Sequence, residues 1–358
     1  MPAIHAGKYF AGIAGLVISS AIACAVFWAP FETDAGDDRR VPASVSSGLE
    51  RKAADVFWRK RRVYDPFPPL VRFQVVTAQE AGPAINEDEF VVGVEADGDA
   101  RAYPLNMLGH PGSEVVNDTL GGRPVAVTFC GLCETPLVFS RRVDERTLTF
   151  FVSGLVVESN MVIQDVETRS AWIQLLGKAV DGPLTGKELD QISSIWTDWK
   201  TWRTKHPETT VVLLKRGSKK YSQAAIGTAS AKQRALGALQ WGLARDGKAR
   251  SWPFAHLARQ RVVNDSFAGT PLLLMFDPER LSPTAFDRRQ GGRELTFRLR
   301  GTELIDETTG SVWDPVTGQA LHGPLEGQRL SPVSGTIATA PTWLVFHPDG
   351  EVWSAGKP

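Results

Sequence analysis

Two of the chain's three cysteines, Cys130 and Cys133, lie three positions apart in the stretch FCGLC. Short strand-like runs flank the pair, PVAVTF before it and PLVFS after it. A C-x-x-C between two strands forms a knuckle whose two thiolates can point at one metal ion. A closed zinc site needs four ligands, so this knuckle supplies half of one. The same two thiols can alternatively form a reversible disulfide.

The remaining ligands of such a metal site must come from elsewhere in the chain. His110 is the best third ligand, and Met161 or Glu134 can serve as a fourth. Thiolate, imidazole and thioether groups together form a soft set that favours copper(I) over zinc. The sequence therefore predicts a metal site made of Cys130, Cys133, His110 and Met161, with copper slightly preferred over zinc. Metal handling or metal-dependent redox chemistry is the leading functional prediction.

Two alternatives remain open. A thiol–disulfide oxidoreductase would use the same cysteine pair, although such a pair normally opens a helix, whereas the run ETPLVFS favours a strand here. A non-catalytic binding or scaffold module of the cell envelope is the third reading. The sequence has no G-x-S-x-G elbow, Walker A loop, H-E-x-x-H motif or dinucleotide fingerprint. Whether the protein is an enzyme, and on which substrate, stays open.

The two halves of the chain resemble each other. Residues 115–154 align with residues 262–301 without a gap, and 16 of the 40 positions are identical. Downstream, the segments around Trp172 and Trp313 also match, as do DGPLTG and HGPLEG. A period of this length is far too long for a solenoid or a propeller blade. We therefore expect a duplicated β-rich unit, with the two tryptophans in equivalent core positions.

The copies differ at the thiols and at two nearby segments. The second copy has Asp277 and Arg280 where the first has its two cysteines. It also shortens GHPGSE, residues 109–114, and LVVESNMVIQDV, residues 155–166. Changes in loop length cost little folding free energy, so this paired loss is informative about use. We expect both segments to converge on the knuckle, with the site in the first copy and a structural role for the second.

The strand and helix patterns predict a mainly β fold of the β-rich α+β kind. The run EFVVGVEADGDARAYPL alternates around Asp97-Gly98, which is a hairpin signal. Trp196, Trp199 and Trp202 recur at spacing three before Pro207, which predicts a helix with a packed aromatic stripe. We expect two related β units packed with pseudo-twofold symmetry and one N-terminal transmembrane or signal helix. The expected parts are 1–29 (anchor or signal), 30–69 (linker and a short helix over 46–62), 70–212 (first repeat), 213–245 (partly helical, mobile connector) and 246–358 (second repeat).

The N-terminal segment Phe10–Ala29 has 20 uncharged residues, about enough to cross a bilayer core as a helix. Lys8 precedes it and four acids follow, so we expect the N-terminus inside and the folded part in the periplasm or outside. Ala21-Ile22-Ala23 offers a signal-peptidase site as an alternative, and Cys24 a lipidation site. All three readings place the folded part outside the cytoplasm.

The overall composition bounds the partners. Lys plus Arg and Asp plus Glu are equal at 40 each, so the chain has no net field that would favour nucleic acid. The folded part holds only two cysteines, which excludes a disulfide-rich scaffold. The membrane, through the N-terminal helix, and envelope proteins are therefore the expected partners.

Several of these segments together resemble the bacterial and archaeal family catalogued as domain of unknown function 3179. The resemblance covers about residues 70–350 and rests on ARAYPL, EVVNDTLGGRPVAVTFCGLC, VSGLVVESNMVIQD, the Trp172 segment and DETTGSVWDPVTGQALHGPLEG. FCGLC resembles the family's Y-C-P-L-C motif, with glycine in place of proline. The family usually has W-H-E before V-N-D, whereas His110 here lies four residues before Glu114. The resemblance implies the duplicated fold unit and a role for the motif, and it implies no activity.

Overall fold

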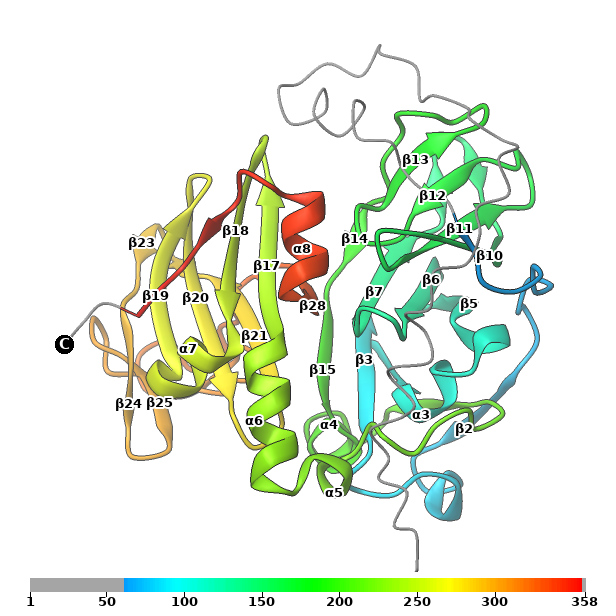
Figure 1. Cartoon of the computed structure of the whole chain (residues 1–358). Helices are drawn as coiled ribbons and strands as arrows, with labels where there is room; N and C mark the ends of the chain where they lie inside the picture. Colours follow the sequence, from blue (N-terminus) through cyan, green and yellow to red (C-terminus); the bar gives the residue numbers. More distant parts are fainter. Residues whose placement is uncertain (1–60, 356–358) are drawn as a thin grey trace, which may run out of the picture. The chain divides into compact units, whose positions relative to one another are not determined.

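The first repeat is built on three sheets. The computed structural model describes residues 61–355 (Figure 1). The three sheets have the strand orders β15-β3-β4-β16-β2, β14-β7-β6-β5 and β1-β10-β11-β12-β13. Strands β8 and β9 form a separate hairpin. The strands are β1 (Arg61–Arg62), β2 (Gln74–Thr77), β3 (Phe90–Ala96), β4 (Asp99–Pro104), β5 (Val115–Leu120), β6 (Arg123–Cys130), β7 (Thr135–Ser140), β8 (Arg142–Val143), β9 (Arg146–Thr147), β10 (Phe150–Val157), β11 (Asn160–Asp165), β12 (Ala171–Ile173), β13 (Lys178–Asp181), β14 (Gln191–Ile192), β15 (Ser194–Asp198) and β16 (Thr210–Leu213).

The second repeat recapitulates this plan with fewer strands. Its sheets have the orders β28-β17-β18-β29, β19-β20-β21 and β24-β25-β26-β27, beside a β22-β23 hairpin. The strands are β17 (Leu239–Arg245), β18 (Lys248–Pro253), β19 (Val262–Phe267), β20 (Thr270–Asp277), β21 (Ser282–Asp287), β22 (Arg289–Gln290), β23 (Arg293–Glu294), β24 (Phe297–Arg300), β25 (Glu303–Asp306), β26 (Val312–Trp313), β27 (Ala320–His322), β28 (Thr336–Thr339) and β29 (Glu351–Val352).

Helices are short and lie between the sheets' strands in sequence. They are η2 (Gly82–Ala84), α3 (Leu105–Leu108), η3 (Pro111–Ser113), α4 (Trp199–Lys205), α5 (Gln223–Ile226), α6 (Ala229–Ala238), α7 (Phe254–Gln260) and α8 (Ala340–Phe346). The connector is thus helical in α5 and α6, as predicted. Its last part, residues 239–245, is strand β17 of the second repeat and pairs with β18 and β28.

The predicted hairpin is confirmed. Strands β3 and β4 pair from Val91 with Pro104 to Ala96 with Asp99. The two residues between them, Asp97 and Gly98, have φ angles of 47° and 89°. Positive φ at both central positions is the backbone that a two-residue turn needs to match the twist of paired strands. Asp-Gly supplies it with little strain, which is why the sequence signal was reliable here.

The tryptophan stripe divides between two elements, so the predicted helix was too long at its start. Trp196 lies in β15, and α4 begins only at Trp199. Asp198 caps the helix, with its side chain accepting a hydrogen bond from the backbone N–H of Thr201 at 2.6 Å. Trp199 and Trp202 are buried, as predicted for a packed stripe. Spacing of three does not by itself separate a helix from a strand that turns into one.

The predicted internal repeat is confirmed in the order of the strands. The order β5-β6-β7 recurs as β19-β20-β21, and the order β10 to β13 recurs as β24 to β27. Trp172 and Trp313 are both buried in equivalent surroundings. Each indole N–H donates to an aspartate and each ring meets a phenylalanine edge-on: Trp172 with Asp165 (3.0 Å) and Phe150, Trp313 with Asp306 (2.9 Å) and Phe297.

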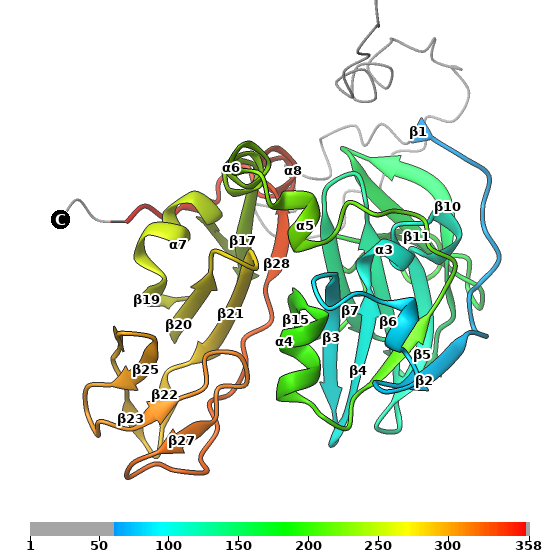
Figure 2. The same ribbon diagram turned by 90° about the horizontal axis from the view of Figure 1, so that it is seen from below.

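Two seams join the repeats, and they differ in chemistry. In one, Trp343 and Phe346 of α8 pack in a single apolar cluster with residues of β11 and β12, such as Ile173 (Figure 1). In the other, α4 lies between β3 and the second repeat (Figure 2), and ion pairs such as that of Lys205 with Asp314 join the repeats there. Arg329 donates two hydrogen bonds of 2.7 Å to the carboxylate of Glu95. A further apolar cluster also contains residues of both repeats. Segments far apart in sequence therefore share one core.

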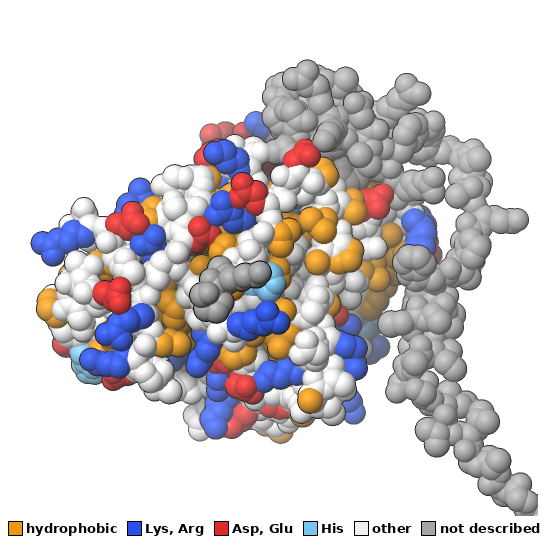
Figure 3. Space-filling view, turned by 60° about the vertical axis from the view of Figure 1, so that its left-hand side comes forward, with side chains coloured by type: hydrophobic (Ala, Val, Ile, Leu, Met, Phe, Trp, Pro, Cys, Tyr) orange, Lys and Arg blue, Asp and Glu red, His pale blue; other side chains and the backbone are white. Residues whose placement is uncertain are grey.

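The predicted N-terminal anchor, the lipidation residue Cys24 and most of the 46–62 helix lie outside the described residues. At its described end that segment differs from the prediction, because Arg61 and Arg62 form β1 and pair with β10. None of the helices within residues 61–355 is long and apolar enough to span a bilayer. On the face in Figure 3, basic and acidic side chains are interspersed, in keeping with their equal totals.

Candidate functional site: a buried cysteine pair

The C-x-x-C knuckle joins β6 to β7. Cys130 ends β6 and pairs with Thr135, the first residue of β7. The four-residue reversal needs a left-handed residue, which Glu134 provides with a φ of 58°. Both cysteine side chains are enclosed, with exposed fractions of 1% and 0%, whereas Leu132 at the tip is 55% exposed. The knuckle therefore presents an apolar tip to solvent and holds both thiols behind it.

The Cys133 sulfur accepts hydrogen bonds from two side chains. The Thr135 hydroxyl donates to it at 3.1 Å and the Asn160 side-chain amide at 3.3 Å. The Cys130 thiol donates instead to the backbone oxygen of Ser159 at 3.7 Å. Hydrogen bonds to a thiolate stabilise the ionised form. The site is therefore arranged to hold a negative charge on Cys133.

The orientation of the Asn160 amide is fixed by its other contacts. Its Nδ2 also donates to Oε1 of Gln174 at 2.8 Å, and its Oδ1 accepts from the backbone of Leu175 at 2.9 Å. Gln174 in turn donates to the Thr128 hydroxyl and to the backbone oxygen of Thr135. A side-chain amide has distinct donor and acceptor ends, so this network keeps the donor end facing the sulfur.

The two thiols ionise differently. Burial raises the pKa of Cys130 well above its ordinary value, and the contact with Cys133 adds to this. Burial also opposes ionisation of Cys133, but its interaction with Cys130 and the hydrogen bonds from Thr135 and Asn160 outweigh it and lower the pKa of Cys133. The first proton to leave the pair is therefore that of Cys133, with the remaining proton on Cys130.

A buried carboxyl group lies beside the knuckle. Glu114 is 9% exposed, and its Oε2 accepts a hydrogen bond of 2.6 Å from the Tyr64 hydroxyl. Its Oε1 lies 3.8 Å from an ideal Cβ on Gly131, which stands between the two cysteines. Burial raises the pKa of Glu114 to about 7, although the Tyr64 hydroxyl and the Gly131 backbone act in the opposite direction. Glu114 can therefore gain or lose a proton near neutral pH.

Tyr64 reaches this carboxylate from the segment 61–67, which lies along β10. The backbone N–H of Val63 bonds to the oxygen of Gly154 at 2.9 Å, and that of Phe67 bonds to the oxygen of Val152 at 3.0 Å. We call residues 61–67 the strap. It follows directly on the part of the chain outside the described residues, and nothing in its sequence signals a site residue.

A third wall of the site comes from the connector between the repeats. The ring of Tyr221 meets Phe129 edge-on at 5.1 Å between centroids. Its hydroxyl lies near the Glu114 side of the knuckle, 3.9 Å from an ideal Cβ on Gly131. Lys220 pairs with Glu134 at 3.0 Å, which ties the connector to the knuckle.

The structure brings several of the predicted residues to the knuckle. Both lengthened segments converge on the knuckle as expected, through Glu114 on one side and through Ser159 and Asn160 on the other. Met161 belongs to the apolar cluster that contains both cysteines. The Nδ1 of His110 instead accepts a hydrogen bond from Gly112 of its own loop at 3.1 Å.

Within residues 61–355, no group of three or more His, Cys, Asp or Glu side chains is arranged to hold a metal ion. The metal prediction for Cys130, Cys133, His110 and Met161 therefore stays a prediction.

The second copy fills the same positions with an ion pair. Arg280 and Asp277, the counterparts of the cysteines, bond at 2.6 Å. Arg280 also reaches Asp198 at 2.7 Å, the residue that caps α4 of the first repeat. Arg261 stands where the first copy has Glu114, since Phe276 bonds to its oxygen as Phe129 bonds to that of Glu114. The second knuckle therefore fastens the two repeats together.

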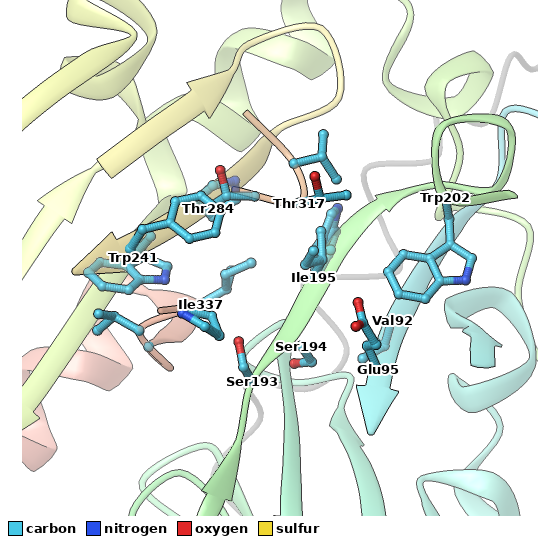
Figure 4. A pocket seen from close by; sticks show the side chains of 18 of the residues that line it. Val92, Glu95, Ser193, Ser194, Ile195, Trp202, Trp241, Thr284, Thr317 and Ile337 are labelled. Carbon is cyan, nitrogen blue, oxygen red and sulfur yellow. The ribbon is translucent and has the colours of Figure 1, made fainter. Parts of the chain in front are cut away.

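A cavity of about 230 Å³ lies between the repeats, and neither cysteine lines it. Figure 4 shows Trp241 and Thr284 on one side of the strand carrying Ile195, and Trp202 and Glu95 on the other. The charged group Glu95 is already paired with Arg329 of the second repeat. The cysteine knuckle therefore remains the place where reactive groups gather.

Comparison with known proteins adds the family and no activity. No curated protein and no solved structure matches the chain. One family profile matches it in two segments, residues 64–240 and 239–357, which correspond to the two repeats described above. The chain thus belongs to the family described as protein of unknown function (DUF3179).

Proposed function

We propose that the first repeat carries a redox-active dithiol and that the protein is a thiol–disulfide oxidoreductase using Cys130 and Cys133. The observation that carries the proposal is the pair of hydrogen bonds to the Cys133 sulfur, from Thr135 and Asn160. A thiolate is the attacking species in thiol–disulfide exchange, and these bonds favour it. A buried structural cysteine needs no such arrangement.

The reaction needs a disulfide as the oxidant. The Cys133 thiolate attacks one sulfur of a disulfide RSSR and releases RS⁻, which leaves a mixed disulfide on Cys133. The Cys130 sulfur then attacks Cys133, gives up its proton and releases the second RS⁻. The dithiol loses two electrons and RSSR gains them, to give two RSH once protons are taken up. Because both thiols are enclosed behind Leu132, the favoured substrates are small-molecule disulfides.

The test is an equilibrium with reduced and oxidised glutathione, followed by an acid quench and mass-tagging of free thiols. Cys24 is replaced by serine in every variant so that only the knuckle reports. In the wild type, the number of tagged thiols in the knuckle should fall from two to none in a single transition as the glutathione buffer becomes more oxidising. Cys130→Ser and Cys133→Ser should each abolish that two-thiol transition, whereas Ser282→Ala, at the position equivalent to Thr135, should keep it.

Two outcomes would overturn the proposal. Both thiols could remain reduced across the whole range of glutathione buffers. The protein, isolated without chelators, could instead contain close to one copper or zinc ion per chain that disappears in Cys130→Ser and Cys133→Ser. The second outcome would establish the metal prediction, which the placement of Met161 in the cysteines' apolar cluster supports. A pair that neither reacts nor binds metal would favour the envelope scaffold.

We also propose that this chemistry takes place outside the cytoplasm, with the protein tethered by residues 10–29. The support is the uncharged length of that segment and its flanking charges. Retention of the full chain in membranes through an alkaline wash tests the tether, and release of a form beginning near Cys24 would contradict it.

We propose in addition that the two repeats pack with pseudo-twofold symmetry. The reciprocal contacts of β15 with β21 and of β28 with β7 support this packing.

A further inference from the structure

We infer that the cavity between the two repeats is a binding site for a small, neutral ring compound that carries an oxygen acceptor, such as an aromatic ketone. Neither cysteine lines this cavity, so the inference does not depend on the proposed function. It gives the molecule a second site with its own ligand chemistry.

The size of the cavity suits one substituted ring. Its volume is about 230 Å³, whereas a well-packed interior has few voids larger than a water molecule. An apolar cavity of about 150 Å³ already accommodates benzene. The space between the repeats can therefore hold a benzene ring with a short substituent.

The walls of the cavity favour a ring over a flexible chain. The larger apolar side chains of the lining come from both repeats and are Ile195, Trp196, Trp202, Trp241, Phe286 and Ile337. Figure 4 shows several of them on both sides of the strand that carries Ile195. Aromatic side chains bind a flat partner well, because ring faces and edges pack closely against one another.

The cavity lies where equivalent positions of the two repeats carry unequal side chains. Trp196 and Ile337 are equivalent, since each lies six residues before the tryptophan at the fourth position of α4 or α8. Val92 and Trp241 are also equivalent, because each precedes a glycine whose added Cβ would collide with that tryptophan. In each pair one repeat supplies an indole and the other a smaller aliphatic group. A second indole at position 337 would fill the space, so divergence of the two copies keeps the cavity open.

The indole N–H of Trp241 is the group that selects an oxygen acceptor. Trp241 is 4% exposed, and none of the hydrogen bonds within residues 61–355 involves its Nε1. The indole nitrogen of Trp196 also lacks a partner, but protein atoms enclose it, whereas that of Trp241 is not enclosed. A Cβ at Gly335 would fall 2.1 Å from the Trp241 ring, so the backbone there lies against the indole and holds it in the wall. An indole nitrogen only donates, and a carbonyl or hydroxyl oxygen of a ligand would supply the missing acceptor.

The charges at the cavity favour a neutral ligand. The titratable residues of its lining are Glu95, His206 and Arg329. Arg329 donates to both oxygens of Glu95 and to the backbone oxygen of Thr317. Burial lowers the pKa of His206 from its ordinary value, so its ring is mostly neutral at pH 7. A ligand carboxylate would therefore enter without a free cation to pair with.

The first experiment titrates the full chain by calorimetry with three probes of similar shape. Acetophenone has the ring and the carbonyl oxygen, α-methylstyrene has a CH₂ group in place of that oxygen, and benzoate carries a negative charge. Acetophenone should bind, and benzoate should bind at least about tenfold more weakly, because its charge would lose water without gaining a cation. Ile337→Trp should abolish acetophenone binding, whereas Val345→Trp, on the exposed face of α8, should preserve it.

The second experiment isolates the hydrogen bond from Trp241. Trp241→Phe keeps an aromatic wall and removes the donor. The ratio of the acetophenone and α-methylstyrene association constants should therefore fall about fivefold in this variant. The ratio should stay unchanged in Trp353→Phe, whose site lies outside the cavity. Changes in packing affect both probes alike and cancel in the ratio.

Three outcomes would overturn the inference. They are no binding of acetophenone by the wild type, equal binding by the wild type and Ile337→Trp, and tighter binding of benzoate than of acetophenone. A ratio that is unchanged in Trp241→Phe would remove the assigned donor and overturn the ligand class. If Ile337→Trp does not fold, the ratio in Trp241→Phe decides the matter.

Discussion

At the residue scale, the proposed function depends on a few polar atoms that make one thiol of the pair more acidic than the other. The hydroxyl of Thr135 is the simplest of these to remove, because valine has nearly the same shape and no donor. A hydrogen bond to a charged group is worth about 1.5–3 kcal/mol. Thr135→Val should therefore raise the pKa of Cys133 and slow its alkylation at neutral pH by about tenfold or more.

The second repeat supplies the control for this substitution. Ser282 occupies the position equivalent to Thr135, and its hydroxyl donates to the backbone oxygen of Trp196. Ser282→Ala removes a buried hydroxyl of the same kind and should leave the alkylation profile of the cysteines unchanged. Equal slowing in both variants would show that the effect comes from a general loss of packing and would contradict a specific bond to Cys133.

Much of this site could be predicted from sequence, and the reason is the internal comparison. Spacing singled out Cys130 and Cys133, and the segments shortened in the second copy pointed to Glu114 and Asn160. The role of Tyr64 could not be found this way, because it lies fifty residues before its partner in an irregular segment. Residue type favoured His110 as a ligand, and in the structure its Nδ1 accepts a hydrogen bond from Gly112.

At the element scale, the strap is the segment whose position most directly affects the site. Gly154 lies beneath it with a φ of 77°, and a Cβ there would fall 1.9 Å from the backbone oxygen of Tyr64. Gly154→Ala should therefore displace the strap, withdraw Tyr64 from Glu114 and cost roughly 2–4 kcal/mol from backbone strain and overpacking together. Denaturant unfolding gives the cost, and faster alkylation of the cysteines reports the displacement.

Gly301 is the matched control for the strap substitution. It aligns with Gly154 in the repeat and also has a positive φ, 63°, but a Cβ there would meet nothing within 4 Å. Gly301→Ala should cost only the backbone strain, roughly 1 kcal/mol, and leave cysteine reactivity unchanged. If the two alanine variants are equally destabilised, the strap is not held in place at Gly154.

The elements themselves follow from sequence to differing degrees. The β3–β4 hairpin was predictable because a two-residue Asp-Gly turn fixes both the backbone and the register. The start of α4 was misplaced because the same tryptophan spacing continues from β15 across the cap at Asp198. Strand β1 was missed altogether, since two arginines carry no alternating pattern and pair with β10 only through tertiary contact.

At the scale of the whole molecule, duplication left two seams with opposite chemistry. Helix α8 closes one seam by apolar packing, and the backbone N–H of Thr339, just before it, bonds to the oxygen of Cys133 at 3.1 Å. The second copy's knuckle closes the other through Arg280 and Asp198. Each knuckle thus touches the start of the other repeat's helix. Both knuckles make such a contact. The first copy can therefore keep its thiols, while the second copy, without thiols, still joins the repeats.

The apolar seam should make global stability depend on pH through His347, which ends α8 and whose ring centroid lies 4.2 Å from that of Trp343. Burial lowers the pKa of His347 from 6.5 to about 4. The unfolded chain therefore binds a proton as the pH falls below about 6.5, while the folded protein does so only near 4. This contribution to the free energy of unfolding is fully present above pH 6.5 and is lost as the pH falls. The loss is smaller than about 3 kcal/mol, because the half-buried ring retains contact with water.

Substitution isolates this contribution from the other titrating groups. The difference in unfolding free energy between wild type and His347→Gln, measured in urea, should shrink or reverse between about pH 6.5 and 4.5. Glu114, whose raised pKa acts in the opposite sense, is present in both proteins and cancels in the difference. His206→Gln, at the equivalent position in α4, should show a smaller trend, because Glu95 lies 3.9 Å from that ring and favours its charged form. A pH-independent difference for His347→Gln would mean that its ring is as well hydrated in the folded protein as in the unfolded chain.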